Sequence, residues 1–153
     1  FIKSLGLDLS LEGWNVGHYW SWIKREDWPW YHIDGQGGNY PHAVINYLLE
    51  GDSGKTKWIT NDMGERLGKI TKQIKDYTSR YIGYKYEGKP IWETILRPNV
   101  AMLTKIDIPH QVDTTEQTNV RWTYRIFLVK NQKFLTYEEV ENDYQNILRK
   151  TYI

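Results

Sequence analysis

The segment that most constrains the fold runs from Val120 to Val129 and is predicted to be a strand. Its even-numbered positions are apolar or aromatic. Side chains alternate between the two faces of a strand, so Arg121, Thr123 and Arg125 share the other face. An unpaired buried charge is costly. Two arginines on one face of a central strand therefore require anionic partners inside the fold.

Short strand patterns separated by turn-forming residues recur along the rest of the chain. They are Trp28 to Asp34, Ala43 to Leu49, Thr56 to Thr60, Ile91 to Leu96 and Val100 to Thr104. Regular repetition of this kind is typical of sandwiches and barrels. We expect an all-β fold with peripheral helices, specifically a double-stranded β-helix (a cupin-like jelly roll) of about eight strands.

Two segments show helical spacing of apolar residues. Residues 62–82 place Leu67, Ile70 and Ile74 at helical intervals, but Gly64 and Gly68 weaken this pattern. An insertion between two strands of a sheet is the alternative for this segment.

The second helical segment is the C-terminal one, predicted over about residues 137–150. Thr136 and Glu139 have the spacing of a capping box. An apolar stripe follows at Val140, Tyr144, Ile147 and Leu148. Such a stripe predicts packing against the sheet or against a partner.

Composition limits the class of protein. The 153 residues fit one domain spanning 1–153. The absence of cysteine excludes disulfides and thiolate metal sites, and it suits a cytoplasmic protein. The net charge of +1 gives no electrostatic reason to expect nucleic acid or a membrane as a partner. No apolar run is long enough to span a bilayer. The oligomeric state is left open.

A possible metal site lies in the sequence His32-Ile33-Asp34. Residues two apart on a strand face the same side, so His32 and Asp34 can reach one metal ion. A third ligand must come from another strand, and His110 precedes a strand-like segment. Two histidines and one carboxylate form the facial ligand set of non-haem Fe(II). The alternative is that these are unconnected surface or core histidines.

Two other histidines are rival metal ligands. His42 follows a proline eight residues after Asp34 and is a rival ligand if the intervening loop folds back. His18 has no carboxylate nearby in the sequence and is interpreted as structural.

Four segments, taken in order, resemble the Fe(II)/2-oxoglutarate-dependent oxygenases. They are Trp30 to Gly35, Ala43 to Leu49, Ile108 to Val112 and Val120 to Phe127. The chain looks most similar to small bacterial and phage-type members related to the phytanoyl-CoA and aspartyl/asparaginyl hydroxylase groups. The resemblance covers about residues 28–129 and rests on the order and spacing of the four segments together.

The resemblance implies that His32, Asp34 and His110 hold Fe(II), with no catalytic residue beyond these ligands. In the family, a basic residue ten to fifteen positions after the distal histidine binds the far carboxylate of 2-oxoglutarate. Arg121 and Arg125 both qualify, since 121 − 110 = 11 and 125 − 110 = 15.

Arg121 is the preferred cosubstrate ligand, with Thr123 beside it. Arg125 is the second candidate. The alternative role of both arginines is a salt bridge to a carboxylate on a neighbouring strand. Asn46, a polar residue in an apolar strand, is a further candidate for the cosubstrate, and its alternative role is a hydrogen-bonded buried amide.

The implied activity is that of an oxidoreductase, a dioxygenase that hydroxylates an unknown substrate. One alternative is a non-catalytic cupin-type jelly roll, a binding or structural domain with a degenerate metal site. The other is a carbohydrate- or nucleic-acid-binding β-domain. It would use some of the eight tryptophans as a stacking platform, although most of them are expected to pack in the core.

Overall fold

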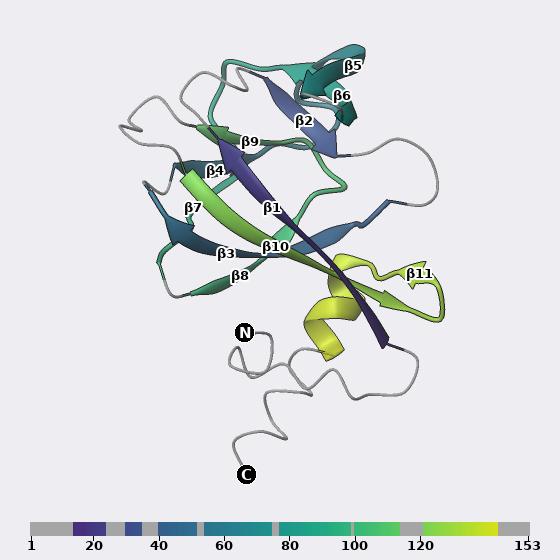
Figure 1. The fold of residues 1–153 in the computed structure, drawn as a ribbon. Helices are drawn as coiled ribbons and strands as arrows, with labels where there is room; N and C mark the ends of the chain where they lie inside the picture. Colours follow the sequence, from purple (N-terminus) through teal and green to yellow (C-terminus); the bar gives the residue numbers. More distant parts are fainter. Residues whose placement is uncertain are drawn as a thin grey trace.

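In the computed structural model, the described residues are 14–23, 30–34, 40–51, 54–74, 77–98, 100–113 and 121–143. For 14–23, 72–74 and 77–79 this description covers the backbone alone. Within these ranges the chain forms eleven strands and a short helix over 137–143, so the expected all-β class is confirmed (Figure 1). No helix in the described ranges is long and apolar enough to cross a membrane.

The strands are short and follow one another closely. They are β1 (Trp14–Ile23), β2 (Tyr31–Asp34), β3 (Ala43–Glu50), β4 (Lys55–Trp58), β5 (Glu65–Ile74), β6 (Tyr77–Lys85), β7 (Trp92–Ile95), β8 (Ala101–Lys105), β9 (His110–Asp113), β10 (Arg121–Lys130) and β11 (Lys133–Phe134).

These strands form two antiparallel sheets that lie one above the other (Figure 1). The first has the order β1-β10-β3-β8, with β11 also paired to β10. The second has the order β5-β6-β2-β9-β4-β7. A side-chain contact joins them where the Trp58 indole nitrogen donates a 2.8 Å hydrogen bond to the carbonyl of Lys105.

The helix predicted within residues 62–82 is wrong, and the alternative of an insertion between strands fits instead. Strands β5 and β6 pair with each other and lie between β4 and β7 in the sequence, and β6 extends the second sheet by pairing with β2. Gly68 has a φ of 86°, and the register shifts between Arg66 and Gly68. A glycine in this conformation is typical of a β-bulge. Gly68, one of the two glycines that weakened the helical pattern, thus belongs to strand β5, and Gly64 lies just before it.

Two of the strands predicted from the sequence are confirmed almost over their full length. Strand β3 covers the expected Ala43 to Leu49, and β10 covers nearly all of the expected Val120 to Val129. Strand β2 begins at Tyr31, and residues 24–29 lie outside the described part.

The C-terminal helix is confirmed over 137–143, and its capping box is formed. The Thr136 amide donates to the Glu139 carboxylate at 2.8 Å, and the Glu139 amide donates to Thr136 Oγ1 at 3.2 Å. The remainder of the predicted helix, with Tyr144, Ile147 and Leu148, lies outside the described residues.

An apolar cluster forms on one face of the first sheet, between β10 and the helix. Its buried members are Ala43, Ile45, Tyr124, Ile126, Leu128, Leu135 and Val140. Because β10 contributes its even-numbered residues here, its odd-numbered residues face the other way, toward the second sheet. The charged face of β10 is therefore available to build a site between the sheets.

We expect Ile126→Ala to lower the free energy of unfolding by about 2–5 kcal/mol, because it opens a cavity in the cluster. Ile126 is fully buried. The matched control Ile95→Ala changes a side chain that is 47% exposed and should shift stability by about 0.5 kcal/mol or less. Urea titration followed by tryptophan fluorescence measures both. Equal losses for the two variants would contradict this placement of the core.

Candidate metal centre

Strand pairing brings the three predicted ligands together. Strand β2 pairs with β9 so that His32 lies directly opposite His110. Directly opposed residues of an antiparallel pair project to the same face of the sheet. Tyr31 and Ile33 project to the other face of β2, into a cluster with Ile59. The alternation predicted for His32-Ile33-Asp34 is thus observed.

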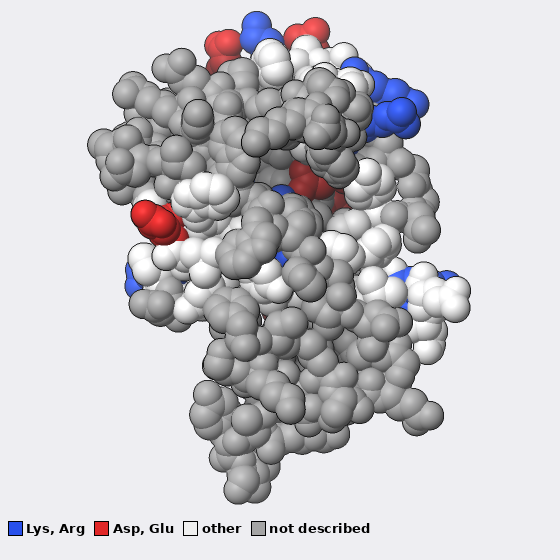
Figure 2. Space-filling view, viewed as in Figure 1, with Lys and Arg blue, Asp and Glu red and all other residues white. Residues whose placement is uncertain are grey.

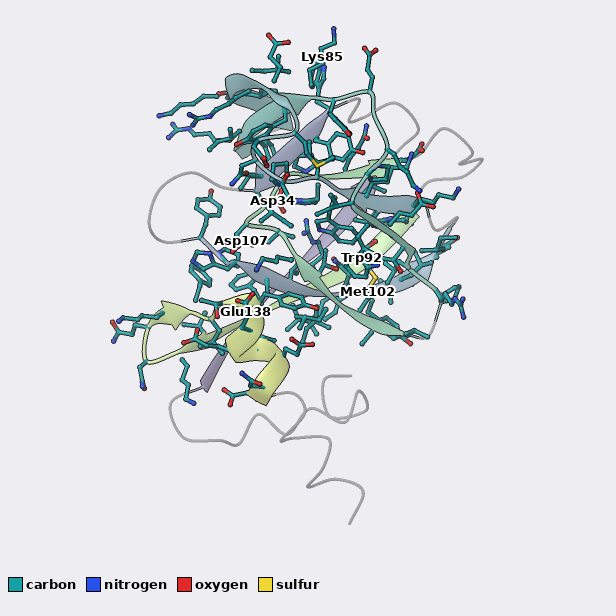
Figure 3. All side chains as sticks on the ribbon, turned by 180° about the vertical axis from the view of Figure 1, so that it is seen from behind. Asp34, Lys85, Trp92, Met102, Asp107 and Glu138 are labelled. Atoms are coloured by element: carbon teal, nitrogen blue, oxygen red, sulfur yellow. The ribbon has the colours of Figure 1, made fainter. Side chains whose placement is uncertain are left out.

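The donor atoms converge at short distances. Asp34 Oδ1 lies 3.3 Å from His32 Nε2 and 3.9 Å from His110 Nε2. One donor atom from each of the three residues lies within 4.8 Å of the others. The two imidazole rings are 4.6 Å apart between centroids. In Figure 3 Asp34 lies between the two sheets, and Figure 2 shows acidic and basic atoms close together in a hollow of the visible face.

The two imidazoles are oriented by backbone carbonyls. His110 Nδ1 lies 3.0 Å from the carbonyl of Ile108, and His32 Nδ1 lies 3.4 Å from the carbonyl of Trp30. A carbonyl only accepts a hydrogen bond, so a neutral His110 that donates from Nδ1 presents its lone pair at Nε2. His32 Nε2 faces the Asp34 carboxylate and would give up its hydrogen on binding a metal ion. The three side chains could then hold a metal ion together.

Electrostatics keep the Asp34 carboxylate ionised. Burial by itself would raise the pKa of Asp34, but the hydrogen bond with His32 and the charge of Arg125 lower it far below its usual range. Arg125 Nη2 lies 3.2 Å from Asp34 Oδ2. This contact crosses from the first sheet to the second. The predicted alternative of a salt bridge for Arg125 is thus observed, but its carboxylate lies on the facing sheet and not on a neighbouring strand.

His110 is held neutral. Burial lowers its pKa to about 4, and the neighbouring charge of His32 acts in the same direction. A neutral imidazole is the form that binds a metal ion.

Arg121 is a buried arginine whose guanidinium is only partly hydrogen-bonded within the described residues. It is only 5% exposed, and its Nε and Nη1 have no hydrogen-bond partner in the described part of the chain. Burial and the charge of Arg125 lower its pKa to about 10. Thr123 Oγ1, on the same face, is also buried and without a partner among the described residues. This face offers buried donors to an anion.

Asn46 is a hydrogen-bonded buried amide. Its Nδ2 donates to Thr104 Oγ1 at 2.7 Å. In the strand register it lies opposite Arg125, so it borders the charged face of β10. Direct contact with a cosubstrate remains a prediction.

His42 is not part of the His32, Asp34 and His110 group. Its Nδ1 lies 3.4 Å from Asp107 Oδ2. The side chain of His18 lies outside the described residues, although its backbone belongs to β1.

Sequence reasoning missed Tyr81, which lies beside the centre. It is opposite Asp34 in the β2–β6 register, and its ring packs edge-on against His32 at 5.3 Å between centroids. No local signal could have identified it, because the contact depends on a hairpin inserted between distant strands.

The chain matches no protein-family model, no curated protein and no solved structure. Its function is therefore inferred from the geometry of the site.

We expect His32→Ala, Asp34→Ala and His110→Ala each to abolish tight binding of a divalent metal, because each removes one of three converging donors. His42→Ala is the control and should bind metal as the unmodified protein does. Isothermal titration with Mn(II) or Fe(II) under anaerobic conditions measures the affinity. Loss of affinity in His42→Ala alone would move the site to that histidine.

The metal-free protein should lose stability as the pH falls from 6.5 to 4. The unfolded chain takes up a proton on His110 near pH 6.5, but the folded chain does so only near its pKa of about 4. Over this window the group contributes a loss of about 3 kcal/mol. Unfolding measured with a chelator at each pH should give a flatter profile for His110→Gln and an unchanged one for the exposed control His42→Gln. A His110→Gln profile as steep as that of the unmodified protein would contradict this origin.

Proposed function

We propose that this chain is an Fe(II)- and 2-oxoglutarate-dependent oxygenase. The observation that carries the proposal is the convergence of His32, Asp34 and His110. Asp34 meets the face of β10 that carries Arg125, and the buried Arg121 belongs to the same face. Two imidazoles and a carboxylate leave coordination positions for other ligands, which is the arrangement used by non-haem Fe(II) oxygenases. A buried guanidinium whose Nε and Nη1 have no partner among the described residues favours an anionic ligand nearby.

The strand order supports a double-stranded β-helix. Without β5, β6 and β11, eight strands remain (11 − 3 = 8). Renumbered in chain order, they give 1-8-3-6 in one sheet and 2-7-4-5 in the other. This is the order expected when a long hairpin of paired strands winds into two facing sheets. The metal ligands then lie on the second and seventh strands, and both arginines lie on the eighth.

Arg121 and Thr123 are proposed to bind the distal carboxylate of 2-oxoglutarate. A guanidinium presents a planar fork of donors that matches a carboxylate. Thr123 Oγ1 adds a buried hydroxyl on the same face. Together they would supply the hydrogen bonds that an anion needs in place of water.

The centre would couple the oxidation of 2-oxoglutarate to the oxidation of a second substrate. When bound, Fe(II) with 2-oxoglutarate and O₂ supplies hydroxylation of a substrate C–H bond, in which 2-oxoglutarate yields succinate and CO₂, and the two oxygen atoms enter succinate and the product. The residues of the chain orient the reactants and exclude water. Iron would be held by His32, Asp34 and His110, and the cosubstrate by Arg121.

We expect Arg121→Lys to weaken 2-oxoglutarate binding to the metal-loaded protein by about 1–3 kcal/mol, because lysine keeps the charge but loses the fork. The exposed Arg97 provides the control Arg97→Lys, which should bind normally. Anaerobic titration calorimetry measures the affinity, and release of CO₂ from 2-oxoglutarate in air measures uncoupled turnover.

The comparison with Arg125→Lys decides which of the two arginines binds the distal carboxylate of 2-oxoglutarate. If only Arg125→Lys weakens binding, the carboxylate belongs to Arg125. If the unmodified protein binds metal but neither binds nor turns over 2-oxoglutarate, the non-catalytic cupin-type domain becomes the better description.

A further inference from the structure

The two oxygens of the Asp34 carboxylate have different partners. Oδ1 faces the Nε2 atoms of His32 and His110, at 3.3 and 3.9 Å. Oδ2 is 3.2 Å from Arg125 Nη2. One oxygen is therefore directed to the metal centre and the other to a cation on the opposite sheet.

The contact between Arg125 and Asp34 is well protected from solvent. The two side chains are 18% and 14% exposed, respectively. Salt and water screen such a pair much less than they screen a surface pair. Arg125 is anchored in the middle of β10, which pairs with β1 on one side and β3 on the other. The position of its guanidinium beside Asp34 is thus fixed by a strand that is paired on both sides.

We propose that Arg125 is a positioning residue that restricts Asp34 to one metal-binding oxygen. A carboxylate can bind a metal through one oxygen or through both. A charge-assisted hydrogen bond to Oδ2 competes with the second mode. This inference rests on the proposed metal centre, but it is independent of the identity of the cosubstrate.

The consequence concerns the number of open positions on the metal. In a six-coordinate centre, His32, His110 and a single oxygen of Asp34 leave three positions. A two-oxygen carboxylate would leave two. A cosubstrate that chelates through two oxygens, together with O₂, needs three positions. Arg125 would thus keep the centre open enough for the proposed reaction without touching the reactants.

Arg121 provides a matched comparison on the same strand face. It is also a buried arginine of β10, but no ion pair joins it to Asp34 among the described residues. A general effect of positive charge on this strand face should appear in variants of both arginines. Control of the carboxylate should appear only in variants of Arg125.

The test counts water molecules on bound Mn(II), used alone as the probe. Electron spin echo measurements in D₂O are made on the full chain at saturating protein, so that no free Mn(II) signal remains. We expect three coordinated waters in the unmodified protein, two in Arg125→Met and three in Arg121→Met. Arg125→Lys retains a cation near Oδ2 and should restore three. Circular dichroism confirms folding, and Arg125→Gln replaces Arg125→Met if the latter does not fold.

Each outcome bears on the proposal. Two waters in Arg125→Met with three in Arg121→Met supports it. Three waters in a folded Arg125→Met or Arg125→Gln, or loss of Mn(II) binding by that variant, overturns it. Failure of the unmodified protein to bind Mn(II) overturns this inference and the proposed function together. Normal water counts without 2-oxoglutarate binding would remove the oxygenase assignment and leave the role of Arg125 standing.

Discussion

Charge balance between the two sheets governs the architecture of the site. One ligating atom from each of His32, Asp34 and His110 converges where water is largely excluded. The largely buried Asp34 carboxylate in this group is stable only with positive charge close by. Arg125 supplies part of that charge from the opposite sheet, and a metal ion would supply the rest. The ion pair between Arg125 and Asp34 also links the two sheets, because Arg125 belongs to the first sheet and Asp34 to the second.

Strand β10 serves both the core and the site because its two faces differ. Its even-numbered residues join the apolar cluster beneath the C-terminal helix. Its odd-numbered residues carry Arg121, Thr123 and Arg125 toward the second sheet. The burial of the apolar face stabilises the strand, and this allows the other face to hold charged groups that would not by themselves favour folding.

The strand patterns around Ala43 to Leu49 and Val120 to Val129 gave correct predictions. The first is a short apolar run that is buried on both faces, and the second alternates between an apolar face and a polar one. Residues 62–82 were wrongly favoured as helical, since Leu67, Ile70 and Ile74 fall at helical spacing by coincidence. Leu67 is exposed in the hairpin. Its helical spacing from Ile70 and Ile74 therefore does not mark a buried face.

The sequence by itself determined which side chains share a face: His32 with Asp34, and Arg121 with Thr123 and Arg125. These relations depend on backbone geometry over a few residues, which the residue types specify. Only the tertiary structure decided that His110 lies opposite His32 and that Arg125, not Arg121, meets Asp34. Such contacts join residues far apart in the chain, and they depend on the register and stacking of two sheets. A shift of one residue in either register would send the same side chains to the opposite face.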